Sequence, residues 1–155
     1  MSILAIDPGY ERSAWLVLHD GMPGDHGLEP NEVILEGLRA GGHGGPDFVV
    51  IEQIESFGMA VGREVFETVF WSGRFAEAAY PIRAIQLPRR AVKLALCGSA
   101  RAKDPNIRQA LIDRFGGSAA IGRKASPGPL YGIAGDVWSA LGVAVTFADA
   151  PGAWT

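Results

Sequence analysis

Two short apolar runs in this sequence each carry a carboxylate at a position where a buried strand would end. The run SILAIDPG, residues 2–9, places Asp7 directly before Pro and Gly, and the run FVVIEQI, residues 48–54, places Glu52 beside β-branched residues. A short apolar run bounded by turn signals is typical of a fully buried strand. A carboxylate in such a strand needs a partner, because burying an unpaired charge is costly. Any fold of this chain must therefore bring partners to both acids.

The rest of the chain shows strand patterns first and helix patterns later. Apart from the two apolar runs, strands are predicted at residues 13–20, 32–39 and 81–87, with a turn-rich stretch at 21–31. Helical spacing of apolar residues predicts a long helix over 61–80. This order of elements predicts a mixed α/β domain.

Shorter helices are predicted in the second half of the chain. Pro88 and Asp104 are residue types that favour helix starts, and Asp104 is expected to be an N-cap. The predicted helices cover residues 88–98, 104–117 and 136–149, and the stretch 118–135 before the last one is expected to be a mobile loop.

Length and composition predict one globular domain over residues 1–155, since 155 residues with 48% hydrophobic content can bury a sizeable core. The one cysteine, Cys97, cannot form an intrachain disulfide. The sequence shows no apolar stretch of membrane-spanning length and no secretory leader. We therefore expect a cytoplasmic protein with no membrane partner.

Charge is segregated along the chain. The net charge is −3, yet residues 83–124 hold ten basic and two acidic side chains, against four basic and fifteen acidic elsewhere. Such asymmetry predicts one face that binds a polyanion, with a solvated face of mixed helices as the alternative.

A third carboxylate, Asp136, stands at the start of the last predicted helix. If the strands that carry Asp7 and Glu52 are neighbours and this helix packs across them, the three acids converge. A divalent ion would offset their repulsion, and hard oxygen ligands favour Mg²⁺ or Mn²⁺. Taken singly, Asp7 could initiate a turn and Asp136 could cap a helix. Taken together, the acids predict a metal site suited to phosphodiester hydrolysis by two ions.

Several segments, in order, resemble the RuvC-type Holliday junction resolvases of the ribonuclease H-like superfamily. ILAIDPG is similar to the first strand of that family, VVIEQI to its second acidic strand, and GDVWSALGVAVTF to its last helix. AVKLALCGSARAKDPNIRQAL resembles the lysine-bearing segment, and GMAVGREVFETVFWSGRF is more similar to the phage-borne branch. The resemblance covers nearly the whole chain and implies an α/β ribonuclease H-like fold, with a mixed five-stranded sheet flanked by helices.

The resemblance also implies an activity, that of a crossover junction endodeoxyribonuclease. Such a protein is a homodimer that binds four-way junctions and other branched DNA and makes paired nicks, with two Mg²⁺ or Mn²⁺ ions per active site. Asp7, Glu52 and Asp136 take the places of catalytic, metal-binding acids. A phage origin would place the protein in the cytoplasm of a bacterial host.

One position departs from the pattern of the family. The last helix of these resolvases carries a further acid three positions after the first, and Ser139 stands there. A hydroxyl is a poorer metal ligand than a carboxylate and brings no charge. One ion is therefore expected to be held weakly, through water, or by another group.

Basic residues complete the predicted site. The resemblance assigns Lys93 and Lys103 to contact the scissile phosphate or to stabilise charge in the transition state. The other basic residues expected to follow the DNA backbones are Arg89, Arg90, Arg101, Arg108, Arg123 and Lys124.

Aromatic residues suggest two further contacts. In relatives, an aromatic side chain soon after the second acidic strand stacks on a base; direct register places Glu55 there, and Phe57 lies two residues on. Phe57 is a candidate for stacking on DNA, with a buried or dimer-contact role as the alternative. The helix predicted over 61–80 has aromatic spacing that suits a core side and an exposed stripe, a candidate dimer interface: Phe66, Phe70, Trp71 and Phe75.

Two other functions remain open at this point. The same carboxylates would serve a nuclease that acts on flaps or RNA–DNA hybrids, since the acids set the chemistry and not the substrate. Ser139 also motivates a non-catalytic protein that binds junctions without cutting them.

Overall fold

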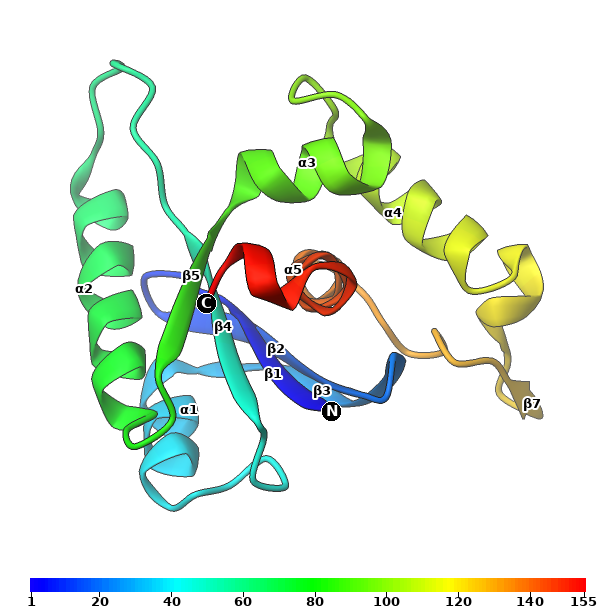
Figure 1. Ribbon diagram of the computed structural model, residues 1–155, viewed down its shortest axis with the longest axis horizontal. Helices are drawn as coiled ribbons and strands as arrows, with labels where there is room; N and C mark the ends of the chain where they lie inside the picture. Colours follow the sequence, from blue (N-terminus) through cyan, green and yellow to red (C-terminus); the bar gives the residue numbers. More distant parts are fainter.

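The computed structural model describes residues 1–155, and a five-stranded mixed sheet in the order β3-β2-β1-β4-β5 lies at its centre (Figure 1). The antiparallel strands are β1 (Ser2–Asp7), β2 (Arg12–His19) and β3 (Met22–Pro30). Two strands, β4 (Phe48–Gln53) and β5 (Ala84–Pro88), continue the sheet parallel to β1. The predicted mixed five-stranded sheet is confirmed.

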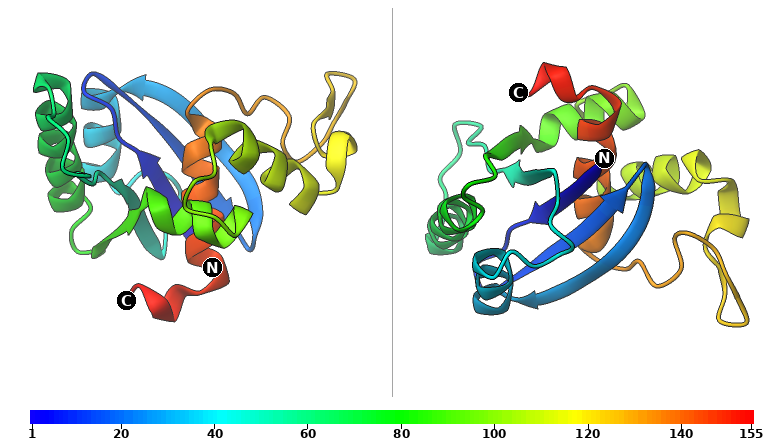
Figure 2. Two further views of the ribbon diagram at one scale, coloured as in Figure 1. Left: turned by 90° about the horizontal axis from the view of Figure 1, so that it is seen from above. Right: turned by 60° about the horizontal axis from the view of Figure 1, so that its bottom comes forward.

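Helices cover both faces of this sheet. On one face lie α1 (Asn31–Arg39) and α2 (Arg63–Ala78), and on the other lie α3 (Arg89–Cys97), α4 (Asp104–Arg114) and α5 (Val137–Asp149), as Figures 1 and 2 show. Alternate residues of β1 serve the two sides, because successive strand side chains point to opposite faces. Ile3 and Ala5 join the core beneath α5, whereas Leu4 and Ile6 join the core beneath α1 and α2.

The last helix, α5, is the centre of the larger core. Ten of its 13 residues are buried, which is typical of a helix enclosed on nearly all sides. It packs against β1 and β2 on one side and against α3 on the other. Gly142 permits that close crossing, since a Cβ there would come within 3.1 Å of Val92. None of the helices is long and apolar enough to cross a membrane.

The sequence prediction is wrong over residues 21–39. The stretch expected to be turn-rich is strand β3, and the expected strand at 32–39 is helix α1. Strand β3 lies at the edge of the sheet and pairs only with β2, and an edge strand tolerates proline. In α1, Ile34 and Leu35 are buried while Glu32 and Glu36 are exposed, so the short apolar run belongs to an amphipathic helix.

Two smaller predictions also need correction. Asp104 is the first residue of α4 rather than its N-cap, which is Lys103. The stretch 118–135 is not an unstructured loop: it contains most of a 3₁₀ turn, η1 (Gly117–Ala120), and a short hairpin of β6 (Gly122–Arg123) and β7 (Ser126–Pro127). Leu130, which follows the hairpin, is fully buried. A second 3₁₀ turn, η2 (Pro151–Ala153), follows α5.

A buried polar network fixes the turn that follows Asp7. The Asn31 side chain accepts a hydrogen bond from Ser13 Oγ at 2.6 Å and donates one to the Gly9 carbonyl at 2.9 Å, and the Gly9 N–H donates to Ser13 Oγ at 3.0 Å. Gly9 is required here, because a Cβ would lie 2.2 Å from the Arg12 carbonyl oxygen. The network therefore holds the end of β1 in place.

We predict that Asn31→Ala destabilises the protein by about 1–3 kcal/mol, because it leaves buried polar groups of the turn without partners. Urea unfolding of the purified variant measures the change. Glu36→Ala on the exposed side of α1 is the control and should lie within about 0.5 kcal/mol of the wild type. Equal effects of the two substitutions would show that the network contributes nothing specific.

Candidate active site

Three parallel strands end at one edge of the sheet, and each delivers a charged side chain there. Ile6 pairs with Ile51, so Asp7 and Glu52, one residue further along β1 and β4, come next to each other. Strand β5 pairs with β4 up to Pro88, and Arg89 follows directly. The carboxyl ends of parallel strands meet at one sheet edge, which is a common place for ligand sites. The predicted adjacency of the first two acids is present in the structure.

Helix α5 adds two side chains to the same edge. Asp136 occupies the N-cap position of α5, where the sequence predicts the start of this helix, and is exposed; its side chain makes no capping hydrogen bond. Ser139 lies one turn further on and is half-buried. Asp136 is close enough for its charge to raise the pKa of Asp7. The three predicted acids therefore lie in one region, although no group of three or more Asp, Glu, His or Cys side chains is close enough to hold a metal ion together.

Like charges and burial perturb Asp7. Burial raises the pKa of its carboxyl well above the usual range, and the neighbouring charges of Glu52 and Asp136 raise it further, while Arg89 acts in the opposite direction. The fold therefore disfavours the charged form of Asp7.

Glu52 has a different environment because Arg89 faces it. Glu52 is 5% exposed, and its Oε1 accepts a hydrogen bond from Arg89 Nη1 at 2.9 Å. The same Nη1 donates a longer bond, 3.4 Å, to Ser139 Oγ, and Nη2 donates to Asp104 Oδ1. Arg89, predicted to follow the DNA backbone, thus lies inside the acidic cluster. Burial lowers its pKa, but Glu52 and Asp104 outweigh this effect and raise it overall, so the guanidinium stays charged.

One part of the cluster suits a divalent cation. Glu52 Oε2 is buried and has no hydrogen-bond partner, and it belongs to the carboxylate that faces Asp7. Two carboxylates with a free oxygen are donors that Mg²⁺ and Mn²⁺ accept. Asp7 and Glu52 therefore fit one such ion. The second set of predicted ligands, Asp136 and Ser139, offers one carboxylate and a hydroxyl that already accepts a bond from Arg89.

A cavity of about 450 Å³ opens beside the cluster, between α4 and the start of α5. Its walls include Arg89, Asp104, Asp136 and Ser139. This volume lies in the range of small-molecule binding sites, so a segment of substrate can reach these side chains from solvent.

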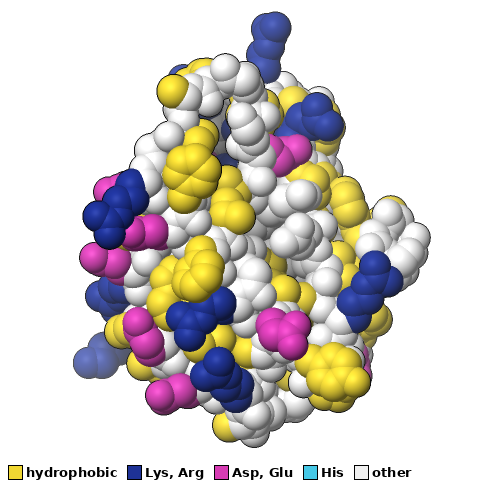
Figure 3. Space-filling view, turned by 90° about the vertical axis from the view of Figure 1, so that its left-hand side faces the viewer, with side chains coloured by type: hydrophobic (Ala, Val, Ile, Leu, Met, Phe, Trp, Pro, Cys, Tyr) yellow, Lys and Arg dark blue, Asp and Glu magenta, His cyan; other side chains and the backbone are white.

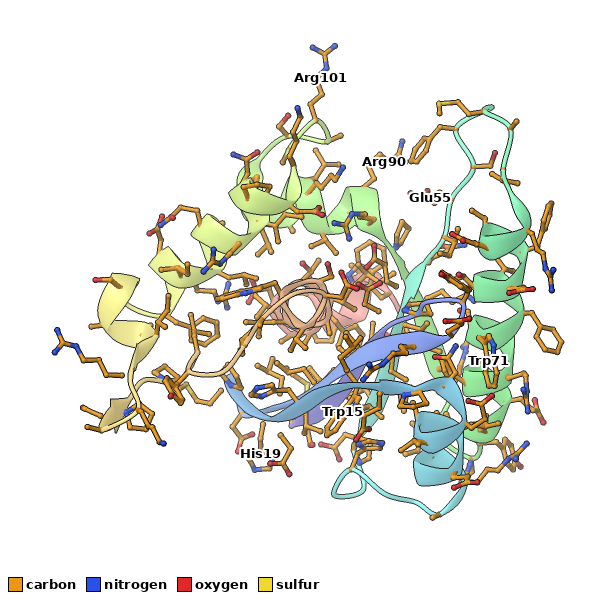
Figure 4. All side chains as sticks on the ribbon, turned by 180° about the vertical axis from the view of Figure 1, so that it is seen from behind. Trp15, His19, Glu55, Trp71, Arg90 and Arg101 are labelled. Carbon is orange, nitrogen blue, oxygen red and sulfur yellow. The ribbon has the colours of Figure 1, made fainter.

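Most of the predicted DNA-contacting residues line the outer surface of the helices around this edge. Arg101, at the turn between α3 and α4, points away from the molecule in Figure 4, and Arg90 lies at the start of α3. Lys93 is half-buried and Lys103 is exposed. Arg108 lies over the Trp138 ring, 5.3 Å from its centroid. The remaining two are exposed and belong to the β6–β7 hairpin: Arg123 and Lys124.

The loop between β4 and α2 carries the two residues considered for base stacking. Phe57 is 73% exposed, so it is free to contact a partner and is not a core residue. Glu55 lies on the side of this loop that faces α3 in Figure 4, and its Oε2 is buried without a hydrogen-bond partner.

Sequence reasoning found the three acids but missed two groups that organise them. Arg89 belongs to the cations predicted to follow the DNA backbone, and its place directly after the third parallel strand becomes visible only in the sheet register. Asn31 was assigned to a turn, and only the fold shows that it spans to Ser13 and Gly9.

The mixed sheet with helices on both faces and acids at the end of β1 and β4 defines an α/β chain of the ribonuclease H-like fold class. More particularly, it is the fold of RuvC. A structure of Thermus thermophilus RuvC superposes with a TM-score of 0.71 and 17% identity, covering 99% of this chain and 96% of that one. T. thermophilus RuvC in complex with Holliday junction substrate gives a TM-score of 0.75 and 19% identity, covering 100% and 98%. No protein-family model and no curated protein sequence matches the chain.

We predict that Asp7→Asn stabilises the metal-free protein at neutral pH. The folded state keeps the Asp7 proton to a higher pH than the unfolded chain does, because its pKa is raised on folding. Wild-type stability therefore falls as pH rises from about 4 towards that raised value, and the amide removes this loss.

Urea unfolding in EDTA at pH 7 and at pH 4.5 tests this, and the advantage of the variant should shrink at the lower pH. Asp25→Asn, at an exposed carboxylate, is the control and should behave like the wild type at both pH values. A variant less stable than the wild type at pH 7 would contradict the prediction.

Proposed function

We propose that this protein is a metal-dependent, structure-selective DNA endonuclease that resolves Holliday junctions and other branched DNA by paired nicks. The observation that carries the proposal is the meeting of Asp7 and Glu52 at the end of two parallel strands, with Glu52 Oε2 buried and unpartnered. The RuvC fold supports it, since a RuvC of this fold has been solved with Holliday junction substrate. We propose a single domain over residues 1–155 in the cytoplasm; a phage origin stays a prediction from sequence.

The roles of the side chains follow from their positions. A bound Mg²⁺ or Mn²⁺ would supply Lewis-acid stabilisation of the phosphoryl oxygens and lower the pKa of a water molecule. Asp7 and Glu52 would hold it, and the rigid strand ends would fix its place relative to the DNA. The two-ion arrangement expected from the sequence would use Asp136 and Ser139 for its second ion, which is the weaker set. Lys93 and Lys103 are proposed to contact phosphate beside the scissile bond.

The basic surface provides the proposed path for DNA. Arg101 and Lys103 are exposed in the turn between α3 and α4, and Arg123 and Lys124 are exposed on the β6–β7 hairpin. Their contacts with phosphates would depend on salt and carry little sequence information. Phe57 is proposed to stack on a base, because it is the most exposed aromatic side chain near this edge after β4.

Helix α2 provides the proposed homodimer interface. Phe66, Val69 and Phe70 are 64%, 50% and 65% exposed, and their spacing of three and four residues places them on one side of the helix. Figure 3 shows the corresponding side of the molecule, where apolar side chains gather between charged ones. Phe75 faces inward and is fully buried. Paired nicks need two active sites, which such a dimer supplies.

A second candidate function is a protein that binds junctions without cutting them. It is favoured by Ser139 in place of an acid, and by the absence of any ready-made cluster of three metal-ligating side chains. Both candidates share the basic surface and differ only in the chemistry at Asp7 and Glu52.

The deciding experiment is cleavage of a plasmid that extrudes a cruciform, with Mg²⁺, Mn²⁺ or EDTA. We predict linear product from paired nicks in wild type with metal, and a rate at least about 100-fold lower for Asp7→Asn. Nicked circles without linear product would argue against a dimer with two active sites. Tight junction binding with no product in any metal would favour the non-catalytic alternative. Faster cleavage of flaps or RNA–DNA hybrids than of junctions would show that those are the preferred substrates.

We predict that Arg101→Ala lowers the slope of log affinity against log salt concentration for junction binding by about 1, the value for one lost phosphate contact. Arg114→Ala is a matched control from the same basic segment. Arg114 forms two hydrogen bonds with Asp149, at 2.7 and 2.6 Å, so it is already neutralised and should leave the slope unchanged. Fluorescence anisotropy in EDTA at several salt concentrations measures both slopes. Equal slopes for both variants would remove Arg101 from the DNA path.

A further inference from the structure

The guanidinium of Arg89 joins three elements at the acidic edge. Nη1 donates to Glu52 on β4 and to Ser139 on α5, and Nη2 donates to Asp104 on α4. The Arg89 side chain is only 30% exposed, and the Glu52 side chain 7%. A guanidinium held at these three points has a fixed position and orientation in the site. It is a built-in cation of the site.

The position of the Arg89 guanidinium matters because it faces Ser139. Ser139 is where the sequence resemblance expects a further acid, and its hydroxyl accepts the bond from Nη1. A divalent ion between Asp136 and Ser139 would lie within a few ångströms of the guanidinium. Two cations that close repel each other, and water screens the repulsion only in part because the Arg89 side chain is 30% exposed.

We propose that Arg89 takes the place of a second divalent ion, so that each site binds one ion, between Asp7 and Glu52. This inference rests on the proposed nuclease function and replaces the two-ion arrangement expected from the sequence. Arg89 orients Glu52 through Oε1 and leaves Oε2 for the ion. Its Nη2 faces the cavity rim, where a phosphate of the DNA would compete with Asp104 for the same donor. The guanidinium stays protonated throughout and exchanges no proton with the substrate.

The test counts bound Mn²⁺ by calorimetry and by the electron paramagnetic resonance signal of free Mn²⁺, without DNA. Wild type is expected to bind one Mn²⁺ per chain. The double variant Arg89→Ala/Ser139→Asp removes the cation and adds the missing carboxylate, and it is expected to bind two. Ser139→Asp alone should still bind one, because Arg89 would pair with the new acid. Wild type that binds two ions or none, or a double variant that still binds one, overturns the proposal.

Two further variants keep the result interpretable. Arg83→Ala removes the same charge from an exposed position at the other end of β5 and should leave the stoichiometry at one. Arg89→Lys keeps the positive charge and should also bind one ion. This variant can be measured if the Arg89→Ala variants fail to fold.

Cleavage separates this inference from the proposed function. If the wild type cuts junctions, its rate at subsaturating Mg²⁺ should rise with the first power of the Mg²⁺ concentration, and a second-power dependence would contradict the single ion. If the wild type cuts nothing while the Mn²⁺ counts change as predicted, the role of Arg89 stands and the nuclease function falls.

Discussion

Asp7 and Glu52 are held side by side at the end of two parallel strands, where burial and the neighbouring carboxylate both disfavour the charge of Asp7. The rest of the site can be understood as an answer to this repulsion. Arg89 pairs with one oxygen of Glu52 and leaves the other without a partner. Nothing in the protein offsets the charge of Asp7 as closely, so the pair retains a place for an added cation.

The scaffold keeps these acids close despite their repulsion. The Asn31 network holds the turn after β1, and α5 is enclosed on nearly all sides, so neither Asp7 nor the start of α5 can easily move apart from Glu52. Arg89 adds a link between β4, α4 and α5 at the same edge. Rigid support of this kind maintains a site whose members would otherwise separate.

Local sequence signals predicted much of this arrangement. The apolar strands, the long helix and the final helix are read from patterns within a dozen or so residues, and all are present. The prediction is wrong over residues 21–39 for two reasons. A stretch with Pro23 and Pro30 can form a strand only at the edge of a sheet, which is where β3 lies. Residues 32–39 form a helix because Ile34 and Leu35 are buried together on one side of it. Both depend on neighbours that the local pattern does not contain.

The sequence by itself determined which side chains carry charge at the ends of buried runs, and therefore the three acids and the likeness to RuvC-type resolvases. Only the tertiary structure decided what surrounds them. Arg89 meets Glu52 across 37 positions and Ser139 across 50, and no local pattern distinguishes it from the other nine basic residues of its segment. Sheet register and helix packing place Arg89 in the site, because β5 ends beside the end of β4, close to the start of α5.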